Sequence, residues 1–317
     1  MTTPHRSLCL IHANCQGDPL AKLLAASPQF AARYEIRRYT NYLRERVAPA
    51  ELSGCELFLY QHLGEKWDDH ASDRLLAMVN PAARVLRLPN MLFTGYWPFW
   101  TNKSPMDFGD AFLDRLVSMG LGMTEILHVY LHGDIAAKYD LDAMLRASLD
   151  VERDKERGAG VAADAEGDRG KVGGHGVDRG HEGQGNDAAG HVLPGGIPAV
   201  VAPTVELVKS LWKQERLFAT INHPNRRLVL HVAEGVLAAL GMDPLPPAVR
   251  DGFTDPYPEF ELPIHPQVAA HHGLSFGGAE ATYNIYGRRM TFEDYVRRYA
   301  DCRLRGIDNF IGYLQLV

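Results

Sequence analysis

A cysteine flanked by two carboxamide residues follows the first apolar run of the chain. That run, Ser7–His12, is predicted to be a buried strand, and a helix is predicted over Asp18–Ala26 with its first residue as the N-cap. Asn14, Cys15 and Gln16 lie between the two elements. A thiol beside a helix N-terminus meets free backbone N–H groups and the positive end of the helix dipole, and both lower its pKa. We therefore expect an activated thiol at Cys15.

The same short loop has the composition of an anion site. Backbone N–H groups at the helix start, together with the carboxamides of Asn14 and Gln16, can hold a phosphate or a developing oxyanion. Gly17 would let the backbone approach a ligand closely. The alternative for Cys15 is a small buried hydrophobic residue, which is the usual place of a free cysteine. Cys9 and Cys55 lie inside apolar runs and fit that alternative.

Polar residues also follow other apolar runs that are predicted to be strands. Gln61 and His62 come after the run 55–60, and Asn90 comes after the run 83–88. The functional crevice of a parallel sheet lies beyond the carboxyl ends of its strands. These side chains are therefore candidates to share one site with the first loop, and ordinary turn residues are the alternative.

A further candidate cluster lies in the later half of the chain. Asn222 and His223 follow an apolar run and precede a helix predicted over Leu228–Leu240. A histidine at that position can act as a general base, or it can simply satisfy the helix N-terminus. The loop Leu88–Pro98 collects aromatic residues, Tyr96 among them, around one glycine and two prolines, which favours a binding wall.

Three other motif matches point to no function. The segment 273–277 fits a nucleophile elbow, but the hydrolase order requires a later histidine and none follows His272. His128 and His132 share a helix face without the glutamate of a zinc protease. Asp140 and Asp142 form only a weak metal motif. No metal site is expected.

The periodicity predicts an α/β fold that is predominantly helical. Strands and helices alternate over residues 1–105, which are expected to form a small parallel-sheet subdomain that carries the cysteine loop. Residues 106–317 are expected to be the mainly helical part of the same domain. Further strands are predicted over Tyr34–Tyr39, Cys55–Tyr60 and Ala83–Leu88. The other predicted helices are Asp69–Val79, Phe108–Met119, Ile135–Leu149, Val205–Leu217 and Phe292–Cys302.

Residues 157–196 differ from the rest in composition. They are rich in glycine, aspartate and histidine and carry few large apolar residues, so they are predicted to be a disordered insertion. The formal net charge of -6 disfavours non-specific nucleic-acid binding. No apolar run is long enough to insert into a membrane, and no signal-peptide pattern stands at the N-terminus. The four cysteines are therefore expected to be reduced and the chain to be cytoplasmic.

Four of these motifs in order resemble the WcbI-like capsular polysaccharide biosynthesis family. They are the strand ending in Asn14-Cys15-Gln16, the triplet Tyr60-Gln61-His62, the segment Pro89–Pro98 and the triplet Asn222-His223-Pro224. The resemblance covers most of the chain apart from the insertion. It implies a mostly helical fold around a small α/β subdomain, with a deep loop-lined pocket for coenzyme A or acetyl-coenzyme A. The cofactor-binding residues that it implies are Asn14, Cys15, Gln16, Gly17, Gln61, Asn90, Tyr96 and Asn222.

The resemblance also implies an acetyltransferase that acts on a sugar or capsular polysaccharide precursor and that works beside other capsule biosynthesis proteins. Acetyl transfer can be direct, with His223 or His62 deprotonating the sugar hydroxyl, or it can pass through an acetylated Cys15. Direct transfer is favoured because only His12, inside the strand end, neighbours Cys15 in sequence. Two alternatives remain: a cysteine-dependent esterase or hydrolase on a small α/β scaffold, and a non-catalytic binding protein of capsule assembly.

Overall fold

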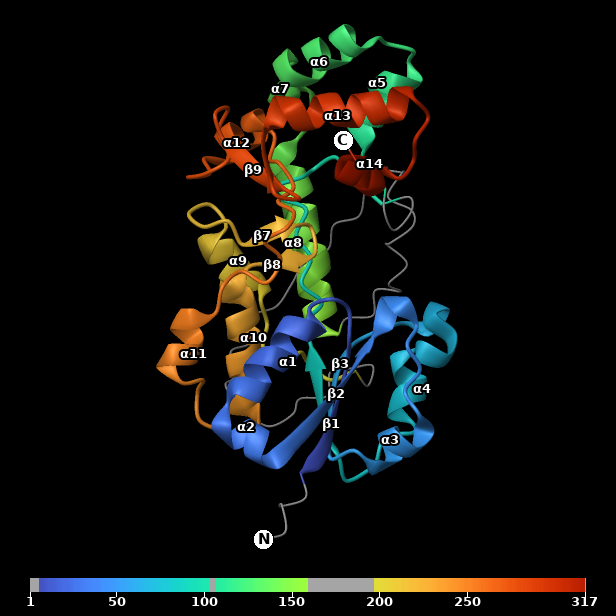
Figure 1. Ribbon diagram of the computed structural model, residues 1–317, viewed down its shortest axis with the longest axis vertical. Helices are drawn as coiled ribbons and strands as arrows, with labels where there is room; N and C mark the ends of the chain where they lie inside the picture. The colour runs from blue at the N-terminus through green and yellow to red at the C-terminus, as the bar shows by residue number, and fades with distance from the viewer. Residues whose placement is uncertain (1–5, 103–106, 159–196, 317) are drawn as a thin grey trace, which may run out of the picture.

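The computed structural model describes residues 6–102, 107–158 and 197–316. Residues 159–196, which make up nearly all of the predicted insertion, lie outside the described residues, so its disorder stays a prediction. Figure 1 shows a four-stranded sheet near the N-terminus and a mainly helical part at the other end of the molecule. The α/β, predominantly helical fold predicted from the sequence is confirmed. The division of the chain at residue 105 stays a prediction.

The sheet consists of β1 (Ser7–Ala13), β2 (Tyr34–Thr40), β3 (Leu57–Gln61) and β4 (Arg84–Leu88). All three strand pairings are parallel, and the spatial order is β2-β1-β3-β4. The chain leaves β1 towards β2 on one side and later places β3 on the other side. The end of β1 therefore lies at the point where the strand order reverses, which is where parallel sheets bind ligands.

Successive residues of β1 face opposite sides of the sheet, as the two-residue period of a strand requires. Cys9, Ile11 and Ala13 belong to the large core on the side of α1 (Gly17–Ala26) and α10 (Arg226–Ala239). Leu10 belongs to a smaller core that includes residues of α3 (Pro49–Gly54) and α4 (Ser72–Leu76). Figure 1 shows these two groups of helices on opposite sides of the strands. Both faces are covered, so the strand ends are the accessible edge.

Several predicted helices are shorter than expected or are broken. The helix predicted over Asp69–Val79 is a 3-10 helix over Glu65–His70 followed by the short α4. The helix predicted over Ile135–Leu149 is α7 (Ile135–Lys138) and α8 (Leu141–Arg157). The break occurs at Asp140, whose side chain caps α8 by accepting a hydrogen bond from Ala143 N. A strong N-cap residue inside a periodic pattern therefore started a new helix.

The structure also contains helices that the sequence pattern did not predict. Pro28, two residues beyond the predicted first helix, begins α2 (Pro28–Arg33). A capping box at Thr291 begins α13 (Phe292–Leu304), the helix predicted over Phe292–Cys302. The remaining helices are α5 (Ala111–Ser118), α6 (Met123–His132), α9 (Val205–Leu211), α11 (Pro247–Gly252), α12 (Pro266–His272) and α14 (Phe310–Leu316). Within the described part of the chain, no helix is both long and apolar enough to cross a membrane.

The long helix α8 runs from the helices α5, α6, α7, α12 and α13 at the far end of the molecule to the sheet (Figure 1). Short strand pairs lie along the way: β5 (Trp100–Thr101) with β6 (Gly109–Asp110), and β7 (Phe218–Thr220) with β8 (His223–Pro224). A hairpin of β9 (Thr282–Ile285) and β10 (Arg288–Thr291) precedes α13. The turn between β7 and β8 carries Asn222, one of the predicted site residues.

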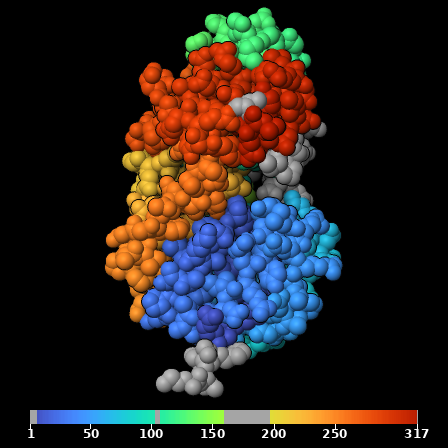
Figure 2. Space-filling model, viewed as in Figure 1, coloured from blue at the N-terminus to red at the C-terminus, as the bar shows by residue number. Residues whose placement is uncertain are grey.

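The proline- and aromatic-rich segment 253–262 joins the two ends of the molecule. Glu261 N donates to the carbonyl of Asn284 in β9, and Leu262 N donates to the carbonyl of Ala219 in β7, both at 2.8 Å. Arg226 N, at the start of α10, donates to Asp255 Oδ1 at 2.8 Å. Figure 2 shows the orange part of the chain packed directly against the blue N-terminal region. This segment therefore passes beside the ends of the strands.

Candidate functional site

Gln16 and Gln61 form the centre of a carboxamide network at the carboxyl edge of the sheet. Gln61 Nε2 donates to Gln16 Oε1 at 2.9 Å and to the carbonyl of Pro89 at 3.0 Å. Gln16 Nε2 donates to the carbonyls of Met91 at 2.7 Å and Asn222 at 2.9 Å, and Gln16 Oε1 accepts from Met91 N at 3.2 Å. Both glutamine side chains are buried. They join the ends of β1, β3 and β4 to the turn between β7 and β8.

Asn14 extends the same network to the surface of the site. Its backbone N donates to Gln61 Oε1 at 2.8 Å, its Nδ2 donates to Asn90 Oδ1 at 3.0 Å, and its Oδ1 accepts from Gln16 N at 2.9 Å. Within the described chain, the side-chain amides of Asn90 and Asn222 donate no hydrogen bond, so they remain available to a ligand. The structure brings together the strand-end residues Asn14, Gln16, Gln61 and Asn90, as the sequence predicted, and it adds Asn222 from the turn between β7 and β8. That these residues bind a cofactor stays a prediction.

The network changes the roles that the sequence suggested for two of these residues. The carboxamide of Gln16 was expected to hold a phosphate or an oxyanion, but its donors are both used by backbone carbonyls. The carboxamide of Gln61 is likewise buried and bonded on both sides. Gln16 and Gln61 therefore position the loop, while Asn14, Asn90 and Asn222 are the members with access to a bound molecule.

The first helix starts earlier than predicted. Its N-cap is Gln16 and its first residue is Gly17, so Asp18 lies inside the first turn and is not the N-cap. Gly17 is buried, and a Cβ atom on it would lie 3.0 Å from the Cβ of Ala13. The glycine is needed for close packing of α1 on β1, so the prediction that it lets a ligand approach is corrected.

The thiol of Cys15 does not have the lowered pKa that its sequence position suggested. Burial raises its pKa, and the negative charge of Glu259 raises it further. The hydroxyl of Tyr257 and the backbone N–H groups of Cys15 and Gln16 act in the opposite direction but do not outweigh burial. At neutral pH the folded protein therefore holds a protonated thiol. Activation of this cysteine would require a base or a bound ligand.

Tyr257 covers Cys15 and was not found by sequence reasoning. Its hydroxyl interacts with the thiol. Within the described chain it has no partner in good hydrogen-bond geometry, although it is buried. The Tyr257 ring stacks on the imidazole of His223, with ring centroids 4.2 Å apart and planes 10° apart. Tyr257 thus links two residues that the sequence offered separately, and its position in a proline-rich segment gave no local signal.

His223 has the properties of a general base that is neutral and has an unpartnered ring nitrogen. Its Nδ1 is buried and has no hydrogen-bond partner within the described chain. Burial lowers the pKa of His223 to about 4, so the imidazole is neutral at pH 7. A neutral imidazole with an unused ring nitrogen can accept a proton from a bound hydroxyl group. The alternative that His223 caps the next helix is wrong, because Asn225 is the N-cap of α10.

His62 lies in a different electrostatic environment. Burial lowers its pKa, the positive charge of Arg87 lowers it further, and Asp73 opposes both effects. No interaction with Cys15 or Tyr257 is present for it in the described structure. Of the two histidines predicted as bases, His223 is the one that the fold links to the cysteine, through the ring of Tyr257.

Tyr96 is a core residue. Its side chain is completely buried, and its hydroxyl donates to the carbonyl of Trp212 at 2.8 Å. Its ring packs edge-on against Phe93, with centroids 4.9 Å apart. The aromatic side chains of the loop 88–98 therefore build the interior rather than a binding wall, and the prediction that Tyr96 binds a cofactor is not supported.

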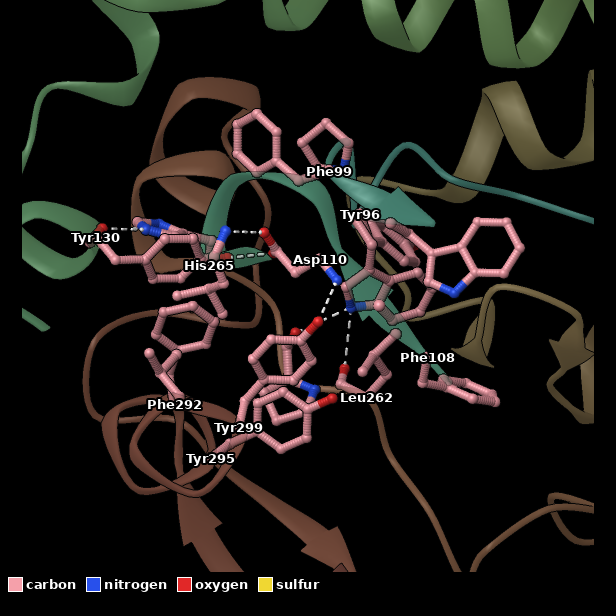
Figure 3. Close-up of a pocket in the computed structure, with 17 residues that line it drawn as sticks. Tyr96, Phe99, Phe108, Asp110, Tyr130, Leu262, His265, Phe292, Tyr295 and Tyr299 are labelled. Carbon is pink, nitrogen blue, oxygen red and sulfur yellow. Dashed lines mark hydrogen bonds between the residues drawn. The ribbon is translucent and has the colours of Figure 1, made fainter. Parts of the chain in front are cut away.

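Figure 3 shows a cavity beside this aromatic core, and Cys15 is not among the residues that line it. Its volume is about 40 Å³, which is room for water but not for a sugar ring. Asp110, which lines it, accepts hydrogen bonds from Phe112 N, Leu113 N and the Tyr130 hydroxyl. Because its carboxylate already caps α5 and binds Tyr130, this cavity is part of the packed interior.

Two cations meet beside the cysteine loop at Asp18. Lys22 Nζ lies 2.7 Å from Asp18 Oδ2, and Arg38 Nε lies 3.7 Å from Asp18 Oδ1. Arg87, by contrast, is buried and donates to the carbonyl of Pro198 at 3.0 Å. Of the positive residues near the strand ends, Lys22 and Arg38 therefore have access to an anionic group.

Comparisons with known proteins agree on one family. The family model for the polysaccharide biosynthesis enzyme WcbI matches residues 8–167 and 199–245. A solved structure of WcbI has a TM-score of 0.69 with 18% identity, over 98% of this chain and 99% of that chain. It is described as a novel polysaccharide biosynthesis enzyme, in the native form without a disulfide bond between coenzyme A and one of its cysteines. At this identity the likeness shows a shared fold. No curated protein matches the chain.

Proposed function

The chain belongs to the WcbI family of polysaccharide biosynthesis enzymes, and on this premise we propose that it transfers acetyl from acetyl-coenzyme A to a sugar hydroxyl. The acceptor would be a capsular polysaccharide precursor in the cytoplasm. The observation that carries the proposal is the cluster at the end of β1, where the Cys15 thiol, the Tyr257 hydroxyl and the neutral His223 imidazole come together. In this cluster the imidazole can act as the general base of acyl transfer, and the tyrosine hydroxyl can stabilise the oxyanion.

Binding of coenzyme A at this edge is supported by the groups that remain available there. The amides of Asn90 and Asn222 are free to donate within the described chain, and Lys22 and Arg38 supply positive charge beside the loop. The description of the similar WcbI structure names coenzyme A together with a cysteine of that protein. In our proposal Cys15 takes the corresponding place beside the thiol end of the coenzyme.

Direct transfer is the version that the described residues favour. The sugar hydroxyl oxygen attacks the thioester carbonyl carbon while its proton passes to the imidazole of His223. The carbon–sulfur bond then breaks, and His223 returns the proton to the sulfur of coenzyme A. Tyr257 would donate a hydrogen bond to the oxygen that becomes negative in the intermediate. The thiol of Cys15, protonated because burial raises its pKa, has no assigned base of its own.

Calorimetric titration with coenzyme A and acetyl-coenzyme A tests the binding step. We expect binding to the wild type, and substitutions at Asn90 or Asn222 to weaken it. A ligand at about 100 times its dissociation constant should add about 2.7 kcal/mol to the stability of the folded state. No heat and no melting shift at millimolar coenzyme A would remove the acetyltransferase proposal.

Mass spectrometry separates direct from covalent transfer. After incubation with acetyl-coenzyme A and no acceptor, direct transfer predicts unmodified protein, and the covalent route predicts one acetyl group on Cys15. His223→Asn should abolish acetylation of the sugar in the direct route. An ester hydrolase would instead cleave simple esters without coenzyme A, and a non-catalytic protein would bind a sugar precursor without turnover.

A further inference from the structure

Three potential metal ligands converge at the far end of the molecule from Cys15. Asp142 lies in the first turn of α8, and His271 and His272 are the last two residues of α12. Figure 1 shows α12 beside the end of α8 that is distant from the sheet. One ligand atom from each of the three side chains lies within 4.8 Å of the other two.

The two distances from the carboxylate to the imidazoles are close to the ligand spacing of a tetrahedral site. Asp142 Oδ1 lies 3.3 Å from His271 Nε2 and 3.6 Å from His272 Nδ1. A zinc ion with bonds of about 2.0–2.1 Å separates neighbouring tetrahedral ligands by about 3.4 Å. The longer contact exceeds the normal length of a hydrogen bond, so hydrogen bonding does not explain why both imidazoles face one carboxylate oxygen.

The backbone that carries the two histidines is held in place at both ends. At the start of α12, Gln267 Oε1 accepts from Ile135 N at 3.0 Å, and Gln267 Nε2 donates to the carbonyl of Gly133 at 2.8 Å. Beyond its end, Ser275 N donates to the carbonyl of Lys213 at 2.8 Å. A site with fixed ligands loses little conformational entropy when a metal ion binds.

Charge and burial also suit a divalent cation. The His272 side chain is nearly buried, so an ion that it binds would be partly shielded from water. Asp142 supplies one negative charge and is 59% exposed, which leaves a side of the group open to water. The positive charge of Lys213 would oppose cation binding. Its Nζ lies 5.3 Å from the centre of the Trp212 ring, and that ring also contacts His272.

We infer that Asp142, His271 and His272 form a binding site for a divalent transition-metal ion, with zinc as the preferred ion and water as its fourth ligand. Two imidazoles and one carboxylate with an open position are a usual zinc donor set. The ion would connect α8 to α12 and so stabilise the end of the molecule distant from Cys15. This inference does not depend on the proposed acetyl transfer.

Titration of the tag-free, chelator-treated full chain with zinc tests the inference. The chain used as reference carries His175→Asn, His181→Asn and His191→Asn, because histidines in residues 159–196 can also take up the probe. We expect one zinc ion per chain with a dissociation constant on the order of 1 µM or below. Cobalt bound at the same stoichiometry should show the visible absorption of a four-coordinate ion with nitrogen and oxygen ligands.

Two single substitutions identify the ligands. His271→Asn and Asp142→Asn, at partly exposed positions, should each weaken zinc binding by about 100-fold and remove the zinc-dependent rise in melting temperature. Circular dichroism without metal checks that each variant folds, and the Asp142 variant keeps the test valid if the histidine variant does not.

The matched control is the exposed histidine pair on α6, His128 and His132, whose ring centroids lie 5.6 Å apart. The double substitution His128→Asn with His132→Asn should leave the zinc affinity unchanged. The inference is overturned if this control loses the ion, if both single variants bind as the reference does, or if binding appears only at millimolar zinc.

Discussion

Replacing Gln16 by glutamate tests whether the carboxamide network supports the site. The substitution keeps the size of the side chain and the oxygen that accepts from Gln61 Nε2 and Met91 N. It replaces the amide nitrogen, which donates to the carbonyls of Met91 and Asn222, with a second oxygen. An ionised carboxylate would then face two carbonyl oxygens in a buried position, so the folded protein should favour the protonated acid.

The size of the effect follows from this protonation. A carboxyl group with an unfolded pKa of about 4.3 costs about 3.7 kcal/mol to keep protonated at pH 7 and about 1 kcal/mol at pH 5. The acid has one donor where the amide has two, and the lost hydrogen bond adds about 1 kcal/mol. Gln16→Glu should therefore destabilise the fold by about 5 kcal/mol at pH 7 and about 2 kcal/mol at pH 5.

The sign of the pH dependence is fixed by the direction of the pKa shift. The introduced group has a folded pKa above its unfolded pKa, so its protonation favours folding at low pH. The favourable contribution is lost as the pH rises towards the folded value. The variant should therefore regain stability, relative to the wild type, as the pH falls from 7 to 5.

Thermal unfolding of Gln16→Glu and the wild type at both pH values is the assay. At about 2 °C per kcal/mol, the melting temperature should fall by about 10 °C at pH 7 and about 4 °C at pH 5. The exposed residue Gln214 provides the control, and Gln214→Glu should change little at either pH. Equal destabilisation of Gln16→Glu at the two pH values, or a loss below about 1 kcal/mol at pH 7, would refute the proposed role of the network.

Three further outcomes are expected. Because burial raises the pKa of Cys15, iodoacetamide should alkylate it more slowly at pH 7 than it alkylates a free cysteine, and faster as the pH rises. Peptide mapping would measure the labelling, and rapid labelling at pH 7 would contradict the prediction. Tyr257→Phe should keep the melting temperature within a few degrees of the wild type, since it removes a buried hydroxyl without a well-placed partner. It should lower the rate of acetyl transfer by about 10-fold or more, and an unchanged rate would exclude Tyr257 from the reaction. Gly17→Ala should lower the free energy of unfolding by about 1–3 kcal/mol in chemical denaturation, because the new Cβ would lie 3.0 Å from the Cβ of Ala13. The control is Gly252→Ala, because no atom lies within 4 Å of the position of a Cβ at the exposed Gly252.

The sequence predicted the strands of the sheet well because their signal is local. Buried parallel strands are short apolar runs, and the run Ser7–His12 became β1 with one residue added. The meeting of Asn14, Gln61 and Asn90 followed from the geometry of parallel strands, without any knowledge of the contacts. Helix existence was also predictable, whereas the break at Asp140 shows that a local cap can divide one periodic pattern into two helices.

The start of α1 was mispredicted because tertiary contacts outweighed a local signal. Asp18 followed by Pro19 is a strong helix-start pattern, and it predicted an N-cap at Asp18. In the structure Gln16 takes the N-cap position, although its side chain makes no capping bond, because that side chain is held by Gln61, Met91 and Asn222. Those partners are distant in sequence, so propensity alone could not weigh them.

The chemistry of Cys15 was unpredictable for the same reason. A helix N-terminus lowers the pKa of a thiol, but the effect of burial depends on what covers the sulfur. Here the cover is Tyr257, more than two hundred positions away in the sequence and inside a segment without regular periodicity. Sequence reasoning could identify the loop, but it could not identify the residue that closes over it.

The composition of the network explains how one edge of a sheet can hold segments from such distant parts of the chain. The backbone groups of Met91, Pro89 and Asn222 are buried near the strand ends and need partners that offer both donors and acceptors. Glutamine supplies both in one side chain without a charge, so burial costs far less than it would for a carboxylate or an ammonium group. The network therefore fixes the loop that carries Cys15 while leaving the local electrostatic potential to be set by other groups. Those groups are Glu259, whose charge acts on the thiol, and the cations at Asp18. Because the network around Gln16 and Gln61 is uncharged, an anionic ligand can bind beside it without disturbing the contacts that hold the fold together.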